Sequence, residues 1–190
     1  MVYKPKLLEV DLSGREISTT YLEEEWVHDF IGGRGLGARM LWARQAPLLD
    51  PLSPEAEVYL LTGPLTGVAP GGAQLCMMFK SPETQKTIGH ALTGANWAAE
   101  LKAAGWDGMI LRGQSPEPVY IHIKDQVVAI RDARHLWGLN TFETEAALKK
   151  EAKDLSARVL SIGPAGENLV RFAAVQQELF RSAARGGAGA

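Results

Sequence analysis

The sequence predicts an α+β fold in which two β-sheets form a base that carries a few helices. Two observations predict this class. Segments in which apolar and polar residues alternate come in pairs around short turns, as they do in β-hairpins, and a segment with helical periodicity follows each pair. The same order of hairpin, tryptophan and helix then occurs a second time along the 190 residues.

The first hairpin is predicted at 7–12 and 16–21, where apolar and polar residues alternate around a Ser-Gly turn. A short helix follows, because Trp26 and Phe30 belong to one apolar helical face that ends at a Gly-Gly pair. A second apolar stripe, at 36–41, predicts another helix before a loop with three prolines.

The middle of the chain is predicted to contain three strands and one helix. Two strands, at 57–62 and 73–80, flank the glycine- and proline-rich loop 63–72. A helix at 97–104 ends at a glycine, and a short apolar strand at 107–112 follows it directly.

The last third begins with a hairpin at 119–123 and 127–131. Asn140 and Glu143 have the spacing of a capping box, which predicts a helix that runs to about residue 153. Two more strands are predicted, at 158–162 and 169–175.

The repeated pattern predicts an internal duplication. Hairpin 7–21 corresponds to hairpin 119–131, and the string YLLTGPLTG at 59–67 corresponds to VLSIGPAG at 159–166, at a spacing of about 100 to 111 residues. We therefore expect one domain over residues 1–190, made of two similar halves at about 1–105 and 106–190. Each half offers a Gly-Pro loop, and these loops are expected to lie on one side of the base.

Composition excludes several classes of protein. The net charge is −2, with 20 basic and 22 acidic residues, so neither a nucleic acid nor a membrane surface is expected as a partner. The N-terminus at 1–6 lacks the apolar stretch of a signal peptide, and a cytoplasmic location is expected. The single cysteine, Cys76, lies in an apolar run and predicts packing rather than reactivity.

Three glycine-rich segments are candidate binding loops. The string at 33–38 matches G-x-G-x-x-A, but it follows a helix and precedes a proline loop, which argues against a dinucleotide site. Loop 63–72 is a second candidate. The segment 181–190 gathers two arginines and three glycines, and successive backbone N–H groups with forked cationic donors suit a phosphate-bearing ligand.

The sequence contains no recognisable hydrolytic or metal motif. Its four histidines are scattered without metal-ligand spacing, and there is no nucleophile elbow, P-loop or H-E-x-x-H. No catalytic residue is therefore assigned to this chain.

Taken together, seven motifs resemble the N-terminal domain of the aldehyde ferredoxin oxidoreductase family, and the resemblance covers essentially the whole chain. They are FIGGRGLGA at 30–38, DPLSPE at 50–55, TGPLTG at 62–67, KSP at 80–82, IRDA at 130–133, LWG at 136–138 and SIGPAGENLVRFAA at 161–174.

The resemblance implies an oxidoreductase that oxidises aldehydes to carboxylates. Its cofactor would be tungsten held by two pterin dithiolenes, with Mg²⁺ between the pterin phosphates, and a [4Fe–4S] cluster would pass electrons to ferredoxin. In that family the N-terminal domain is a saddle of two β-sheets under the paired pterins. The motifs for the cluster cysteines and the substrate cavity lie beyond this chain's end, so the chain is expected to be active only with the remaining domains or a separate catalytic chain. An apolar face that meets those parts predicts self-association of the chain alone.

The same resemblance implies the cofactor-binding residues. Arg181, Ser182, Arg185 and Gly186 match a family segment of the form H-R-A-A-G-R-G-G, which contacts the pterin. Gln74, Leu92 and Gly94 match positions in the A-P-T-G-G-R and A-N-S-G-G segments. The backbone carbonyls of Leu92 and Ser182 are the candidate Mg²⁺ ligands.

This sequence departs from the family pattern at several of these positions. Gln74 replaces an arginine and so carries no charge, and Leu92 replaces an asparagine. Phe180, Ser182 and Ala184 replace a histidine, an alanine and a glycine. Three functions stay open: the cofactor base of the aldehyde enzyme, the equivalent domain of a benzoyl-CoA reductase-type tungsten subunit, and a non-catalytic pterin-binding or assembly module.

Overall fold

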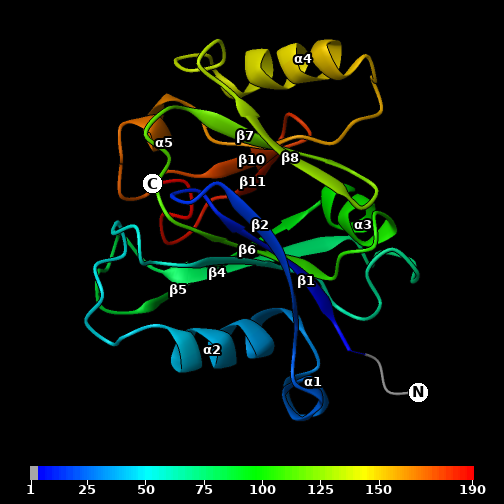
Figure 1. Ribbon diagram of the computed structural model, residues 1–190, viewed down its shortest axis with the longest axis vertical. Helices are drawn as coiled ribbons and strands as arrows, with labels where there is room; N and C mark the ends of the chain where they lie inside the picture. The colour runs from blue at the N-terminus through cyan, green and yellow to red at the C-terminus, as the bar shows by residue number, and fades with distance from the viewer. Residues whose placement is uncertain (1–3) are drawn as a thin grey trace.

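The computed structural model describes residues 4–190. The first three residues of the predicted domain, which are also the start of the segment 1–6 predicted not to be a signal peptide, lie outside the described residues. Figure 1 shows the arrangement of the elements. In chain order they are β1 (Lys6–Asp11), β2 (Glu16–Tyr21), α1 (Glu24–Phe30), α2 (Gly33–Arg44), β3 (Val58–Leu61), β4 (Gln74–Lys80), β5 (Ile88–Gly94), α3 (Trp97–Ala103), β6 (Gly108–Arg112), β7 (Val119–Lys124), β8 (Val127–Asp132), α4 (Thr141–Ala152), β9 (Leu160–Ser161), α5 (Pro164–Glu167), β10 (Val175–Gln177) and β11 (Arg181–Ala183).

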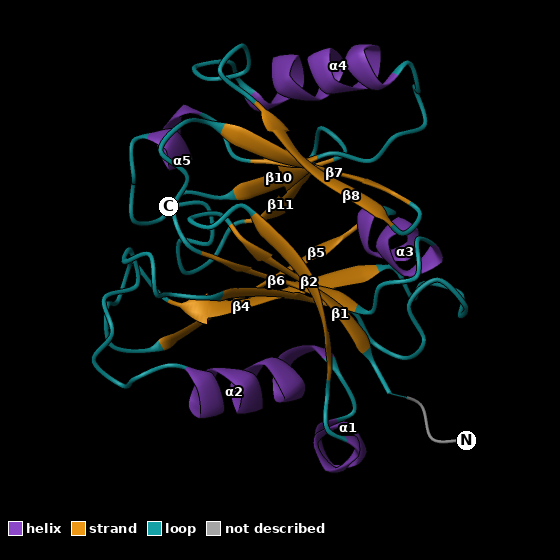
Figure 2. Cartoon of the chain, in the orientation of Figure 1, coloured by secondary structure: helices purple, strands orange, loops and turns teal. Residues whose placement is uncertain are grey.

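The centre of the fold is a six-stranded sheet with the order β2-β1-β6-β3-β4-β5. Its pairs are antiparallel apart from β1 and β6. A second layer on one face consists of the three-stranded sheet β11-β10-β9 and the hairpin β7-β8 (Figure 2). The α+β class is thus confirmed, and the second layer is divided into two separate ladders.

Two apolar cores hold these layers together. Between the six-stranded sheet and the second layer, Leu8, Met77 and Trp106 pack with Ile121 and Ile130 of the hairpin. On the opposite face of the sheet, helix α2 buries Leu36 and Met40 against Tyr59 and Met78. Strand residues alternate between these two cores because successive side chains point to opposite faces of a sheet.

Most predicted elements occur close to their predicted positions. The capping box of α4 is formed, since the Asn140 side chain accepts from the backbone of Glu143 and the Glu143 side chain accepts from the backbone of Asn140. The strand predicted at 169–175 is wrong for most of its length. Helix α5 places Leu169 at a φ of 53°, with its backbone N–H bonded to Gly166, so the chain turns there and strand β10 begins only at Val175.

Strand β5 was not predicted, although it forms the outer edge of the large sheet. Strand β6, which belongs to the second predicted half, lies in the middle of the same sheet. The internal duplication, with halves at about 1–105 and 106–190, stays a prediction.

A polar cluster around the buried Glu57 joins the end of α2 to the sheet. The Arg44 guanidinium donates from Nε and one Nη to the two carboxylate oxygens of Glu57, at 2.8 and 2.7 Å, and the same Nη lies 3.0 Å from Glu9. The buried Tyr59 hydroxyl also donates to Glu57. Burial alone would raise the pKa of Glu9, but the Thr20 hydroxyl and the Arg44 charge lower it by more, so Glu9 stays ionised at neutral pH.

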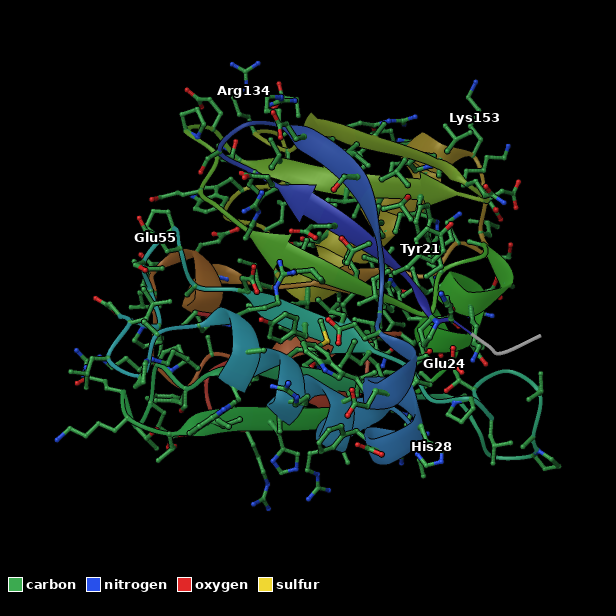
Figure 3. All side chains as sticks on the ribbon, turned by 60° about the horizontal axis from the view of Figure 1, so that its bottom comes forward. Tyr21, Glu24, His28, Glu55, Arg134 and Lys153 are labelled. Carbon is green, nitrogen blue, oxygen red and sulfur yellow. The ribbon has the colours of Figure 1, made fainter. Side chains whose placement is uncertain are left out.

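We expect Glu57→Gln to destabilise the fold by about 1–2 kcal/mol, because the buried Glu57 carboxylate accepts hydrogen bonds from Arg44 and Tyr59 that an amide cannot accept equally well. Denaturant unfolding measures the change. Glu55→Gln is the matched control, since Glu55 is exposed on the loop before β3 (Figure 3). Equal stability of the two variants would show that the buried ion pair contributes nothing.

Candidate functional site

The two edge strands β5 and β11 lie side by side and form what we call the seam. β5 ends the six-stranded sheet and β11 ends the three-stranded sheet. Gly186, just after β11, lies against Gly89 near the start of β5. Glu178, just before β11, accepts a hydrogen bond from the backbone of Asn96, just after the end of β5. The two strands therefore run in opposite directions. No backbone hydrogen bond joins β5 to β11 anywhere in residues 4–190.

The backbone of β5 presents polar groups to the seam at Leu92 and Gly94. The β4-β5 ladder is bonded at Ala73 with Ala95 and, in the same register, at Ser81 with Thr87. In an antiparallel pair, bonded and non-bonded positions alternate. The N–H and C=O groups of Leu92 and Gly94 therefore point away from β4, toward β11.

Gln74, Leu92 and Gly94 are brought together by this ladder. Gln74 is paired with Gly94, and Cys76 with Leu92, so the three predicted residues share one face of the sheet. Gln74 is exposed, the Leu92 side chain is 41% exposed, and no atom lies within 4 Å of a Cβ built on Gly94. This corner of the sheet is open to a ligand.

The other predicted residues lie on and just after β11. Arg181 and Arg185 are exposed, and neither forms an ion pair with a carboxylate of residues 4–190. The Ser182 hydroxyl donates to the side chain of Gln176 on the neighbouring strand. Gly186 has a φ of 76°, and its carbonyl accepts from the Ser81 hydroxyl at 2.9 Å, which ties the loop to the end of β4.

The seam therefore combines two kinds of group. On one side the strand edge offers outward backbone carbonyls and amides. On the other side, two guanidinium groups that have no carboxylate partner within residues 4–190 supply positive charge. Arginine forks bind phosphate in a bidentate manner, and backbone carbonyls are ligands for hard cations such as Mg²⁺. The arrangement suits a phosphate-bearing ligand that carries a divalent cation.

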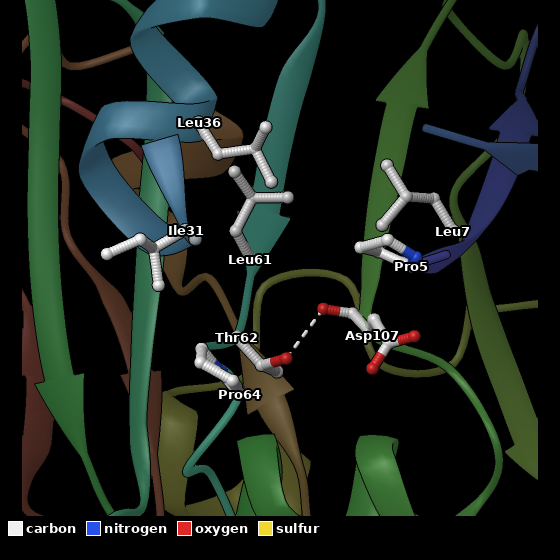
Figure 4. Close-up of a pocket in the computed structure, with 10 residues that line it drawn as sticks. Pro5, Leu7, Ile31, Leu36, Leu61, Thr62, Pro64 and Asp107 are labelled. Carbon is white, nitrogen blue, oxygen red and sulfur yellow. Dashed lines mark hydrogen bonds between the residues drawn. The ribbon is translucent and has the colours of Figure 1, made fainter. Parts of the chain in front are cut away.

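The glycine-rich string at 33–38 forms no comparable site. The string at 33–38 is the start of α2, where Gly37 packs so closely on Met78 that a side chain would overlap it. A cavity of about 10 Å³ lies between this helix start and Thr62, whose hydroxyl donates to the carbonyl of Asp107 at 2.6 Å (Figure 4). Such a cavity holds at most one water molecule.

A cavity of about 970 Å³ opens between the six-stranded sheet and the hairpin β7-β8. None of the seven predicted site residues lines it. Its polar lining mixes the cations Arg131 and Arg158 with the carboxylates Glu100 and Glu167, so its charge favours no class of ligand.

Neither a metal-ligand cluster nor a membrane-spanning helix is found in the described part of the chain. Within residues 4–190 no three His, Cys, Asp or Glu side chains come close enough to hold a metal ion. No helix in that range has the length and apolar character needed to cross a lipid bilayer. Cys76 is buried under α2, and burial raises the pKa of its thiol to about 11, which keeps the thiol protonated and unreactive.

Thr93 and Gln177 lie at the seam, and neither was among the site residues predicted from the sequence. Both are buried, and the Gln177 side-chain amide donates to the Thr93 hydroxyl at 2.9 Å across the two sheets. A buried glutamine gives no sequence signal of its own. Only the motif around 92–94 pointed to this stretch of chain.

Comparisons with known proteins show the family of the chain. Residues 7–190 match the model of the aldehyde ferredoxin oxidoreductase N-terminal domain. The chain is 47% identical over 186 residues to the tungsten-containing aldehyde ferredoxin oxidoreductase of Thermococcus kodakarensis, covering 97% of this chain and 31% of that protein. It is 39% identical over 203 residues to the aliphatic sulfonate oxidoreductase, WOR-like subunit, of Pyrococcus furiosus, covering 99% of this chain and 32% of that protein.

A solved structure shows the same fold. It is the active site complex BamBC of benzoyl coenzyme A reductase with 1,5-dienoyl-CoA, which matches with a TM-score of 0.93 and 40% identity over 97% of this chain and 28% of that one. The chain thus spans about a third of the length of the curated relatives that it matches.

Proposed function

The chain belongs to the aldehyde ferredoxin oxidoreductase family, and on that premise we propose that it binds a tungsten bis-pterin cofactor at the seam between β5 and β11. It is the base on which the cofactor of a larger oxidoreductase rests, and it contributes no catalytic side chain of its own. The observation that carries the proposal is that Arg181 and Arg185, which have no carboxylate partner in the described part of the chain, lie beside an open strand edge.

The residues of the seam fit such a cofactor. Arg181 and Arg185 would hold the pterin phosphates, and the outward carbonyl of Leu92, with that of Ser182, would bind Mg²⁺ between them. The open space at Gly94 allows a flat ring to approach the backbone. Because Leu92 offers its backbone, the loss of an asparagine side chain at this position does not remove the ligand.

Gln74 is the weakest part of this fit. Its amide can hydrogen-bond to the cofactor but cannot neutralise a negative charge, so Arg181 and Arg185 carry all of the positive charge that we assign to the site.

When bound, the tungsten centre would supply the redox chemistry that converts an aldehyde to a carboxylate, with electrons leaving through a [4Fe–4S] cluster to ferredoxin. The groups for the cluster and the substrate would come from further domains or a separate catalytic chain. Within residues 4–190 this chain binds, orients and neutralises the cofactor. A cytoplasmic location accords with an oxygen-sensitive cofactor.

A second candidate function is the equivalent domain of a benzoyl-CoA reductase-type subunit. The fold similarity to the BamBC complex favours it, since 97% of the chain matches at a TM-score of 0.93. The seam would have the same role in both enzymes.

Elemental analysis tests the proposal. The chain is produced in a host that makes tungstopterin, purified without oxygen, and analysed for tungsten by mass spectrometry and for pterin by fluorescence after acid oxidation. We expect one tungsten and two pterins per chain. Pterin without any redox activity after a catalytic partner is added would instead indicate a non-catalytic carrier, and neither tungsten nor pterin would overturn the proposal.

We also expect the isolated chain to self-associate. Phe142 and Phe180 form an edge-on pair with ring centroids 5.8 Å apart, yet they are 47% and 78% exposed. Exposed aromatic pairs drive association because their burial removes apolar area from water. Sedimentation velocity should show oligomers, and Phe142→Ser should reduce their amount. Val127→Ser, which removes an exposed apolar side chain from the turn of hairpin β7-β8, should leave the oligomers unchanged. A monomer at all concentrations would contradict this.

A further inference from the structure

Each hydrogen bond that crosses the seam in residues 4–190 involves at least one side chain. The Gln177 amide bonds to Thr93, the Ser81 hydroxyl bonds to the carbonyl of Gly186, and the Asn96 backbone donates to Glu178 at 2.8 Å. Because no backbone ladder joins the two strand edges within residues 4–190, these contacts help to set their spacing, together with the packing of Ala91 and Ala183 in one apolar core.

The contact between Thr93 and Gln177 is placed between the two halves of the cofactor site. Thr93 stands between Leu92 and Gly94 on β5. Gln177 is the direct cross-strand partner of Arg181. One hydrogen bond thus connects β5, which offers the carbonyl, to β10, and β10 in turn pairs with β11 at Arg181.

This contact is buried and leaves one polar atom without a partner among the described residues. Thr93 is 3% exposed and Gln177 is 1% exposed, so water does not compete for the bond. The side-chain oxygen of Gln177 has no hydrogen-bond partner within residues 4–190. A buried amide oxygen without a partner lowers stability, so an apolar pair of the same shape would hold the fold equally well or better.

We propose that Thr93 and Gln177 are positioning residues that set the distance between the two edges of the cofactor site. The expected effect on the cofactor rests on the proposed function. The effect on the spacing of the strands does not depend on a cofactor. Neither residue touches the cofactor in this account, and both act through Leu92, Gly94 and Arg181.

The double variant Thr93→Val with Gln177→Met separates positioning from stability. It removes both polar partners and leaves an apolar contact of similar volume, so we expect its melting temperature to equal or exceed that of the wild type. Pterin should nevertheless leave the loaded protein about fivefold faster, the effect expected for one net hydrogen bond. Thr93→Ser, which keeps the hydroxyl, should release pterin at close to the wild-type rate.

A second readout needs no cofactor. Hydrogen exchange of the backbone amides at Thr93 and at 181–186 should be faster in the double variant than in the wild type. Thr20→Val is the matched control, because it removes a threonine hydroxyl bonded to Glu9 at 2.6 Å, away from the seam. It should change neither pterin release nor exchange at the seam.

The outcomes distinguish the two proposals. Unchanged exchange and unchanged pterin release in the double variant would overturn the positioning role. A wild type that binds no pterin, together with faster seam exchange in the double variant, would overturn the proposed function and support the positioning role in the fold.

Discussion

Replacing Arg181 and Arg185 together by alanine is expected to weaken pterin binding by about 100-fold or more. Each guanidinium is expected to make a charge-assisted hydrogen bond to phosphate worth about 1.5–3 kcal/mol, and every 1.4 kcal/mol is a factor of ten in affinity. Both side chains are exposed, so the fold should melt at nearly the wild-type temperature. The measurement is pterin content after anaerobic purification and dialysis.

Two controls separate the charge of the arginines from their forked donor geometry and from their position in the fold. Lysine at both positions keeps the charge but loses the forked donors, so it should give intermediate binding. Arg134→Ala removes an arginine at the outer rim of the molecule (Figure 3), where Arg134 pairs only with Asp132 among the described carboxylates, and it should not affect pterin. Full retention of pterin by the alanine double variant would place the phosphates elsewhere.

Gly187→Ala is expected to destabilise the protein by about 2–5 kcal/mol. Gly187 has a φ of 85°, which a residue with a Cβ adopts only with strain, and a Cβ built there overlaps the backbone oxygen of Arg171. The loop that carries Arg185 would have to move away from 81–82 and 171. Denaturant unfolding measures the loss of stability, and pterin retention should fall with it.

Gly71→Ala isolates the backbone-strain part of this effect. Gly71 has a φ of 74° but is open, with no atom within 4 Å of a built Cβ. Its substitution should therefore cost only the strain of the left-handed backbone, about 1–2 kcal/mol. If the two variants lost the same stability, close packing at Gly187 would contribute nothing.

Local patterns were enough to predict the elements whose signals lie within a few residues. The hairpin around Ser13-Gly14 and the capped helix α4 follow from turn and capping chemistry that does not depend on the rest of the fold. Strand β5 escaped because its outward residues are His90 and Leu92, and because it contains glycines at 89 and 94, so no alternation marks it. The strand predicted at 169–175 failed because α5 imposes a turn on an apolar segment.

The family motifs named candidate residues for the site, which stay a prediction, but they carried no information on its geometry. The family motifs gave Leu92 and Arg181 without showing that β5 and β11 are facing edges. That arrangement depends on contacts far apart in sequence, such as Thr93 with Gln177. Gln177 could not be singled out, because its burial is set by tertiary packing and not by its neighbours in the chain.

The most direct test of the account is to locate tungsten in crystals of the loaded protein by anomalous scattering at the tungsten absorption edge. We predict one anomalous peak over the seam, with pterin density on both sides and phosphate oxygens within hydrogen-bond distance of Arg181 and Arg185. A tungsten peak away from β5 and β11, or pterin density with no contact to either strand, would contradict the assignment of the seam as the cofactor site.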